Sequence, residues 1–192
     1  VKPSWEELEV PTRRKVIEID PESSFGTGQH DTTRMCLELL DGRVCEGDSM
    51  LDLGCGSGIL SIAALKSKAG KVNCVDIDPQ ATLVAAENLE VNGCDAEKYN
   101  LLTGNILEDE SLKELFRNEK ADVVLANILA EVIAPLSDEA ADYIKDGGYF
   151  ITSGIINDKE ELIVNKINAD PALTLVDVQH DGDWVSVIAQ KK

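Results

Sequence analysis

The segment that most restricts the fold is Leu51-Asp52-Leu53-Gly54-Cys55-Gly56-Ser57-Gly58, where three glycines alternate between a predicted strand and a predicted helix. Glycine tolerates positive φ in a tight turn and lets backbone N–H groups approach a ligand closely. A dinucleotide fingerprint needs its third glycine one position later, where Ile59 stands. The spacing therefore argues against NAD, whereas the Asp52 carboxylate suits a ligand that carries positive charge. Taken alone, the segment also fits a plain glycine turn.

Short apolar segments that read as strands alternate with helical segments over most of the 192 residues. The predicted strands are 50–53, 72–77, 99–103, 122–126, 149–152, 173–179 and 184–189, and the predicted helices are 59–68, 79–92, 110–118, 130–144 and 159–168. Such alternation indicates a parallel sheet covered by helices on both faces. The last two strands are joined by too few residues for a parallel crossover, so they form an antiparallel hairpin. We therefore predict an α/β fold with its ligand crevice at the carboxyl ends of the strands.

Residues 1–24 precede the alternating part of the chain and form a leading segment, in which 15–20 partly alternates and reads as a strand. The next stretch, Phe25-Gly26-Thr27-Gly28-Gln29-His30, is a loop that contains two glycines. Asp31-Thr32-Thr33 follows this loop and is predicted to cap a helix that runs to about Leu40.

Composition limits both the class of protein and the class of partner. Hydrophobic residues make up 43% and charged residues 28%, as in ordinary globular proteins. The net charge of −18 repels phosphate backbones and anionic lipids, and favours a basic protein or an amine as partner. The five cysteines match no metal-ligand spacing, so we predict no metal site and interpret them as buried thiols of a cytoplasmic protein. No apolar run approaches the ~20 residues of a membrane helix.

Three polar residues end successive predicted strands, at the edge of the sheet where the crevice is expected. Asp76 could accept hydrogen bonds from both ribose hydroxyls of a nucleoside ligand, or could cap the helix that begins at Pro79. Asn105 could contact an adenine edge, or could satisfy its own loop backbone. Asn127 could bind an amine and a carboxylate, or could cap the next helix. S-adenosylmethionine is a positively charged nucleoside and suits these residues.

Four stretches taken together resemble the PrmA family, the methyltransferases of large-subunit ribosomal protein eleven: residues 25–33, residues 51–58, Asp76-Ile77-Asp78-Pro79 and Asn127-Ile128-Leu129. The resemblance extends from about residue 15 to the C-terminus. It implies a class I S-adenosylmethionine-dependent methyltransferase, with a Rossmann-like α/β fold and a mostly parallel seven-stranded sheet closed by an antiparallel C-terminal hairpin. The cofactor-binding positions of the family fall on Thr33, Gly54, Asp76 and Asn127, and we add Gly56 and Asn105 from their places beside the crevice.

The resemblance also implies a division of the chain. Members of the family carry an N-terminal domain that recognises the ribosomal protein and a linker that joins it to the catalytic domain. We therefore expect residues 1–24 to be a remnant of that linker, with the recognition domain absent, and residues 25–192 to be the methyltransferase catalytic domain.

The implied reaction is methyl transfer to lysine or N-terminal amines of a basic ribosomal protein, with no direct nucleic-acid partner. Such a transfer needs a neutral amine, in-line alignment and exclusion of water. We expect Asn127 to orient the amine, and His30 either to accept the leaving proton or to shape the pocket. Two other functions stay open, namely a class I methyltransferase of a small molecule or RNA, and a non-catalytic nucleotide-binding module.

Overall fold

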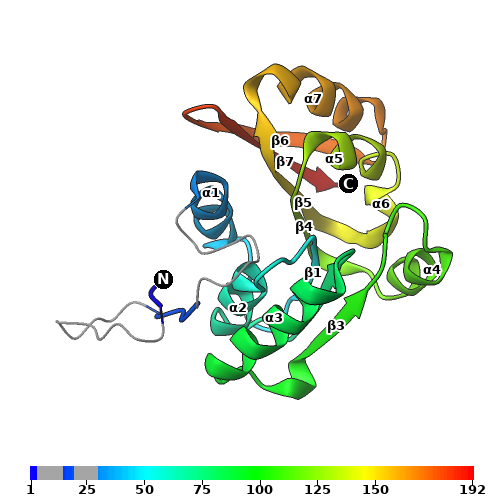
Figure 1. The fold of residues 1–192 in the computed structure, drawn as a ribbon. Helices are drawn as coiled ribbons and strands as arrows, with labels where there is room; N and C mark the ends of the chain where they lie inside the picture. Colours follow the sequence, from blue (N-terminus) through cyan, green and yellow to red (C-terminus); the bar gives the residue numbers. More distant parts are fainter. Residues whose placement is uncertain (4–14, 20–29) are drawn as a thin grey trace.

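The structure is a computed structural model that describes residues 1–3, 15–19 and 30–192, so the loop predicted at Phe25–Gln29 lies outside the described residues. A seven-stranded sheet lies between two layers of helices (Figure 1). The strands are β1 (Ser49–Leu53), β2 (Lys71–Asp76), β3 (Tyr99–Thr103), β4 (Ala121–Asn127), β5 (Ile144–Ile156), β6 (Leu173–Asp181) and β7 (Trp184–Lys191). The helices are α1 (Asp31–Leu40), α2 (Ile59–Lys66), α3 (Pro79–Val91), α4 (Glu110–Asn118), α5 (Ala130–Leu136), α6 (Ala140–Tyr143) and α7 (Glu160–Ala169), with short 3-10 helices η1 (Ala96–Lys98) and η2 (Asn157–Lys159).

The strand order is β3-β2-β1-β4-β5-β7-β6. Strands β1 to β5 pair in parallel, whereas β7 is antiparallel to both β5 and β6. The predicted α/β class, the mostly parallel seven-stranded sheet and the antiparallel C-terminal hairpin are therefore confirmed. The order reverses at β1, where β2 lies on one side and β4 on the other, and the carboxyl ends of these three strands meet at one edge.

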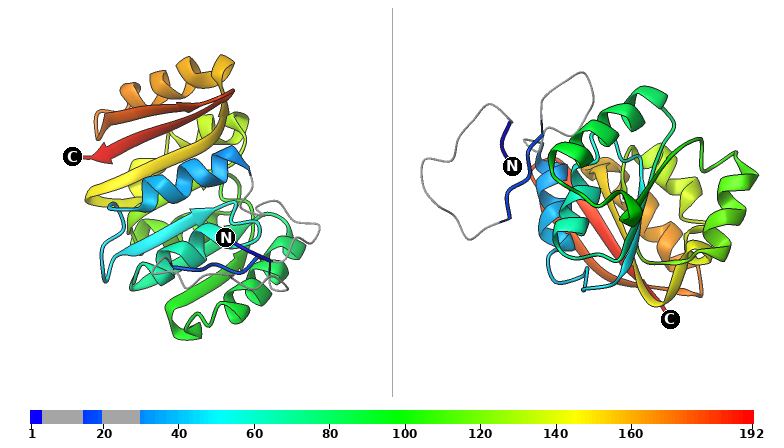
Figure 2. Two further views of the ribbon diagram at one scale, coloured as in Figure 1. Left: turned by 90° about the vertical axis from the view of Figure 1, so that its left-hand side faces the viewer. Right: turned by 90° about the horizontal axis from the view of Figure 1, so that it is seen from below.

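Two hydrophobic cores flank the sheet, and Figure 2 shows the helices that cover its two faces. Helices α1, α2 and α3 pack on one face, and α4, α5, α6 and α7 pack on the other. Strand β1 contributes Met50 to the first core, and Leu51 and Leu53 to the second. Because successive strand residues point to opposite faces, Asp52 faces the same layer as Met50. The continuous buried run of β1 is typical of a parallel strand that is covered on both sides.

The predicted strand at 15–20 is wrong over its described part, because within residues 15–19 the structure shows a single isolated parallel bridge, between Lys2 and Glu18, in place of a strand. A side chain replaces the missing strand partner: the Glu18 N–H donates to Asn92 Oδ1 at 3.0 Å, and Asn92 Nδ2 donates to the Glu18 carbonyl at 2.7 Å. Ile17 and Ile19 are buried in the first core. The alternation in the sequence therefore reflects burial of Ile17 and Ile19 in the first core and not membership of the seven-stranded sheet.

The predicted helix over 130–144 is also wrong, because two helices and the start of β5 occupy these residues. Pro135 lies inside α5, where it lacks the N–H that an α-helix needs. The Ser137 hydroxyl donates to the Ile133 carbonyl at 2.8 Å, and α5 has ended by this point. Glu139 lies between α5 and α6 and forms ion pairs with Lys113 and Arg117 of α4. These contacts with a distant helix stabilise the break.

Candidate active site

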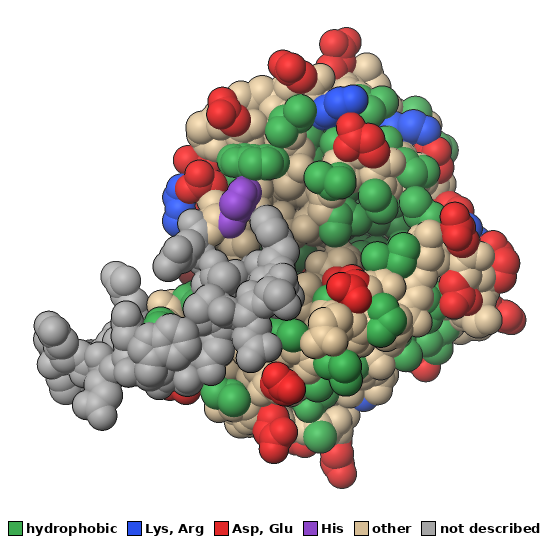
Figure 3. Space-filling model, in the orientation of Figure 1, with side chains coloured by type: hydrophobic (Ala, Val, Ile, Leu, Met, Phe, Trp, Pro, Cys, Tyr) green, Lys and Arg blue, Asp and Glu red, His purple; other side chains and the backbone are tan. Residues whose placement is uncertain are grey.

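A cavity of about 560 Å³ opens at the carboxyl ends of the parallel strands, within the range of roughly 300–1,000 Å³ that is usual for small-molecule sites. Its walls come from the ends of β1, β2 and β4, the loop after β3, the first turns of α1 and α5, and the facing ends of β5 and β7. Figure 3 shows hydrophobic side chains around a hollow on this face, with acidic side chains beyond them. The cavity lies where the sequence predicted the crevice.

The glycine turn forms one wall of the cavity. Gly54 has a φ of +75°, and a Cβ at this position would collide with the Ile128 side chain. The Gly54 N–H donates to the Val75 carbonyl at 2.8 Å, and the Gly56 N–H donates to Asp76 Oδ2 at 2.9 Å. Only glycine can make the first of these turns, and the bonds to β2 hold the turn against the neighbouring strand.

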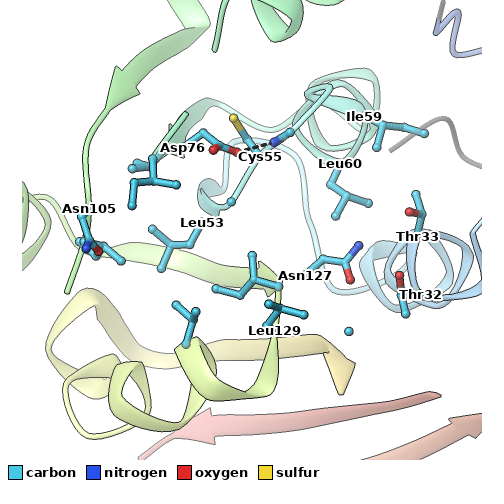
Figure 4. Close-up of a pocket in the computed structure, with 18 of the residues that line it drawn as sticks. Thr32, Thr33, Leu53, Cys55, Ile59, Leu60, Asp76, Asn105, Asn127 and Leu129 are labelled. Carbon is cyan, nitrogen blue, oxygen red and sulfur yellow. Dashed lines mark hydrogen bonds between the residues drawn. The ribbon is translucent and has the colours of Figure 1, made fainter. Parts of the chain in front are cut away.

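Asp76 and Asn105 lie at one end of the cavity (Figure 4). Asp78, and not Asp76, caps α3, since its side chain accepts from the Gln80 N–H at 2.9 Å. Asp76 Oδ1 accepts from the Asp78 N–H at 3.0 Å, so both of its oxygens are fixed by the backbone while the residue lines the cavity. Asn105 Oδ1 accepts from the Leu107 N–H at 3.1 Å, the loop-satisfying arrangement that its sequence position left open.

Thr33 and Asn127 lie at the other end of the cavity, where Asn127 points toward α1 (Figure 4). Thr33 Oγ1 and Asn127 Oδ1 are buried and have no hydrogen-bond partner among the described residues. Asn127 does not cap α5, because Leu129 occupies the N-cap position and makes no side-chain cap. A buried oxygen without a partner costs free energy, so these two atoms mark a place where a ligand with N–H or O–H groups would be stabilised.

His30 is the N-cap of α1, which corrects the prediction that Asp31-Thr32-Thr33 caps this helix. Its Nδ1 accepts from the Thr32 N–H at 3.3 Å and lies 2.8 Å from Thr32 Oγ1. The His30 ring also packs edge-on against Trp184, with 5.0 Å between the ring centroids. Both rings line the cavity. Sequence reasoning missed Trp184, because only the antiparallel return of β7 beside β5 brings it to this end of the sheet.

Asp52 does not line the cavity, contrary to the expectation that its carboxylate faces a ligand. The residue is 0% exposed, and its Oδ2 accepts a 2.6 Å hydrogen bond from the Ser61 hydroxyl of α2. Asp52 Oδ1 has no partner among the described residues. Burial raises the pKa of this carboxyl to about 6; the Ser61 bond opposes the rise, and the negative charge of Asp76 adds to it.

Two large apolar side chains at the rim were also absent from the sequence-based site. Ile77 and Leu129 are each 67% exposed, and both line the cavity.

In the part of the chain that the structure describes, no group of three or more His, Cys, Asp or Glu side chains could hold a metal ion. No described helix has both the length and the apolar character to cross a membrane. The residues that line the cavity are mainly apolar, with a few fixed polar groups at each end.

Comparison with known proteins places this geometry in a family. The chain matches the family described as "Ribosomal protein L11 methyltransferase (PrmA)" over residues 1–192. It is 44% identical to the ribosomal protein L11 methyltransferase of Lachnospira eligens and 43% identical to that of Agathobacter rectalis, and each match covers the whole chain. The chain spans 61% and 60% of the lengths of these two relatives.

Solved structures agree with this placement. The crystal structure of a ribosomal protein L11 methylase from Lactobacillus delbrueckii subsp. bulgaricus superposes with a TM-score of 0.86 at 28% identity, covering 99% of this chain and 93% of that one. A methyltransferase complexed with SAH, SMU.776, shares the fold, with a TM-score of 0.68 at 14% identity over 83% of this chain and 46% of that one. The chain belongs to the PrmA family of ribosomal protein L11 methyltransferases.

Proposed function

We propose that the chain is the catalytic unit of an S-adenosylmethionine-dependent N-methyltransferase whose target is ribosomal protein L11, with lysine or N-terminal amines as acceptors. The observation that carries the proposal is that one apolar cavity has polar groups at both of its ends. Asp76 lies at one end and accepts a hydrogen bond from the glycine turn; at the other end lie two buried oxygens, Thr33 Oγ1 and Asn127 Oδ1, for which the described residues offer no hydrogen-bond partner. Membership of the PrmA family supports the same reaction and target.

The cavity fits the two ends of this cofactor. Asp76 suits a ribose, while Ile77 and the loop after β3, which contains Asn105, line the cavity beside it with side chains that suit an adenine ring. Thr33, Asn127 and the backbone of Gly54 and Gly56 suit a polar amino-acid group, which supplies the N–H donors that the buried oxygens lack. When bound, S-adenosylmethionine supplies a methyl group on a positively charged sulfur.

The acceptor amine is proposed to enter beside Asn127, between His30, Leu129 and Trp184. Asn127 orients the amine, and the apolar rim excludes water from the reacting atoms. His30 stays a candidate for receiving the proton. Because its Nδ1 accepts from the Thr32 N–H, the neutral ring carries its hydrogen on Nε2, and protonation would break the cap of α1. This arrangement favours the pocket-shaping role.

The surface charge supports a basic protein target. The chain has a net charge of −18, which attracts a basic ribosomal protein and disfavours direct binding to RNA. We also propose that residues 1–24 belong to a linker between a recognition domain and the catalytic domain, and that residues 25–192 are the catalytic domain. A ribosomal target would place the enzyme in the cytoplasm.

Two measurements test the proposal. Calorimetry should detect one site that binds S-adenosylmethionine and S-adenosylhomocysteine, and no binding of NAD under the same conditions. Incubation with radiolabelled S-adenosylmethionine and purified L11 should label the protein, and acid hydrolysis should recover the label as N-methylated amines. Binding of NAD in place of the methyl donor, or label recovered only in RNA or a small molecule, would contradict the proposal.

A further inference from the structure

The tip of the β6–β7 hairpin (residues 181–184) lies beside α1, on the side of the cavity where the acceptor amine is proposed to enter (Figure 1). Asp181 is the last residue of β6, and its register partner in β7 is Trp184. Trp184 lines the cavity, whereas Gly182 and Asp183 between the two strands are exposed. The position of the tip relative to α1 therefore sets the position of one wall of the acceptor entrance.

Two contacts join α1 to this tip, and we call them together the α1–hairpin seam. Inside the cavity, the His30 ring packs edge-on against Trp184, with 5.0 Å between the ring centroids. On the outer surface, the Arg34 guanidinium donates a hydrogen bond to the Asp181 carboxylate and forms an ion pair with it. Neither Arg34 nor Asp181 lines the cavity. Because Arg34 lies one helical turn after His30 and Asp181 lies opposite Trp184, the outer contact holds together the same two elements as the inner one.

The two sides of the seam are anchored differently. Helix α1 is anchored by its apolar face, where four side chains are buried, namely Met35, Cys36, Leu39 and Leu40. The hairpin tip is held on its other side by η2, where the Asn157 N–H donates to the Asp183 carbonyl at 3.1 Å and Asn157 Nδ2 donates to the Gly182 carbonyl at 3.3 Å. Arg34 supplies an ionic tie on the α1 side, so its loss should displace the tip and not the helix.

Arg34 balances the charge of three carboxylates at the seam. Asp31 Oδ1 accepts from Arg34 Nη2 at 3.2 Å, and Glu38 Oε1 lies 3.7 Å from Arg34 Nη1, both within α1. Asp181 accepts from the same Nη2 atom but belongs to the hairpin. Without the cation, Asp31 and Asp181 would face each other across the seam with like charges, which repel. An exposed ion pair adds little to global stability, so we expect the effect to be local.

We propose that Arg34 is a positioning residue for the acceptor amine: by holding the hairpin tip against α1, it keeps Trp184 at the wall of the acceptor entrance. The inference rests on the proposed function, since it takes an amine of L11 as the acceptor. Methyl transfer needs in-line alignment, so a wall that moves away lowers the share of bound amines that are aligned. Thr33 and Asp76 lie outside the tip. Loosening the seam should therefore lower kcat/KM for L11 and leave the affinity for S-adenosylmethionine unchanged.

Charge reversal at the outer contact tests this role in a methyl-transfer assay at low salt. Arg34→Glu turns the attraction to Asp181 into repulsion and should lower kcat/KM for L11 about two- to tenfold. The added negative charge by itself favours a basic substrate, so long-range attraction cannot produce this loss. Arg34→Glu combined with Asp181→Arg restores an ion pair with the charges exchanged and leaves the net charge at −18, and it should recover most of the activity.

Lys145→Ala is the matched control. Lys145 pairs with Asp122, and these two side chains are 48% and 30% exposed, against 51% and 32% for Arg34 and Asp181. The control pair lies near the starts of β5 and β4, at the end of the sheet opposite the cavity. This variant should therefore keep its kcat/KM for L11.

The fluorescence of Trp184 reports the seam without any substrate. The chain has two tryptophans, so Trp5→Phe leaves Trp184 as the single emitter. In this background, Arg34→Glu should increase the quenching of Trp184 by acrylamide, and the charge-exchanged double variant should reverse the increase. High salt should move the unmodified seam toward the quenching of Arg34→Glu, because salt screens exposed charges. If Arg34→Glu does not fold, Asp181→Asn removes the same ion pair and should give the same changes.

The outcomes separate the inference from the proposed function. Unchanged quenching and kcat/KM after loss of the Arg34–Asp181 pair would overturn the inference, as would failure of the charge exchange to recover them. A parallel loss of S-adenosylmethionine affinity would also overturn it, because Arg34 would then act on the whole cavity. Absence of methyl transfer by the wild type, with the quenching difference intact, would refute the proposed function and leave the contact between α1 and the hairpin standing.

Discussion

Thr33→Val is expected to raise the stability of the protein and to weaken cofactor binding at the same time. The Thr33 side chain is 0% exposed, and its hydroxyl has no partner among the described residues. Valine has the same shape without the hydroxyl, so the cost of burying an unpaired polar group, about 1–3 kcal/mol, disappears from the free energy of folding. With the cofactor bound, the hydroxyl is paired and its loss costs about 1 kcal/mol, so together with the gain of the free protein the binding free energy falls by about 2–4 kcal/mol, hence roughly 30- to 1,000-fold weaker binding.

Urea unfolding gives the stability and calorimetry with S-adenosylmethionine gives the affinity. Thr152→Val is the matched control, because Thr152 is equally buried but its hydroxyl donates to the Val187 carbonyl at 3.0 Å. This control should lose about 1 kcal/mol of unfolding free energy and keep its affinity. Thr33→Val with lower stability and unchanged affinity would refute the reasoning, since it would mean that the hydroxyl is already satisfied within the protein.

Three further outcomes are expected. Asp76→Ala should weaken S-adenosylmethionine binding roughly ten- to hundredfold by calorimetry, because a charged acceptor for the ribose is lost together with the bond that holds Gly56, and unchanged affinity in a folded variant would count against the role of Asp76. His30→Asn keeps an N-cap acceptor for α1, so its methyl-transfer rate should exceed that of His30→Ala; equal, near-complete loss in both variants would instead point to His30 as the proton acceptor. Residues 1–192 should bind the cofactor fully but methylate L11 weakly and in a salt-sensitive manner, because oriented docking adds effective molarity that screened surface charge does not; full activity at high salt would show otherwise.

The architecture could be predicted from local sequence patterns, because the burial of each strand on both faces of the sheet determines where its apolar residues lie. Buried runs such as that of β1, the glycine turn after it and the four-residue connection before Trp184 were enough to predict the sheet, the crevice and the hairpin. Asp76 and Asn127 were placed correctly at the cavity because they end parallel strands.

The errors arose where distant parts of the chain decide the local structure. Residues 15–20 alternate like a strand, but the backbone of Glu18 bonds to the side chain of Asn92 and not to a neighbouring strand of the sheet. The break at Glu139 is stabilised by ion pairs with α4. Trp184 reaches the cavity only through the pairing of β7 with β5. The position of Asp52 two residues before the turn was not enough to predict its surroundings, because spacing alone does not determine toward which face of the sheet the side chain points. The side chain is buried and does not line the cavity.

The strand order leaves β3 and β6 as the two edges of the sheet, and both are poor templates for a further strand. Strand β3 has five residues, whereas β6 is interrupted by a register shift between Leu175 and Asp177 and carries acidic side chains at Asp177 and Asp181. Short edges, bulges and inward or terminal charges are the means by which sheets avoid pairing edge to edge. These features disfavour pairing of one copy's sheet edge with that of another copy.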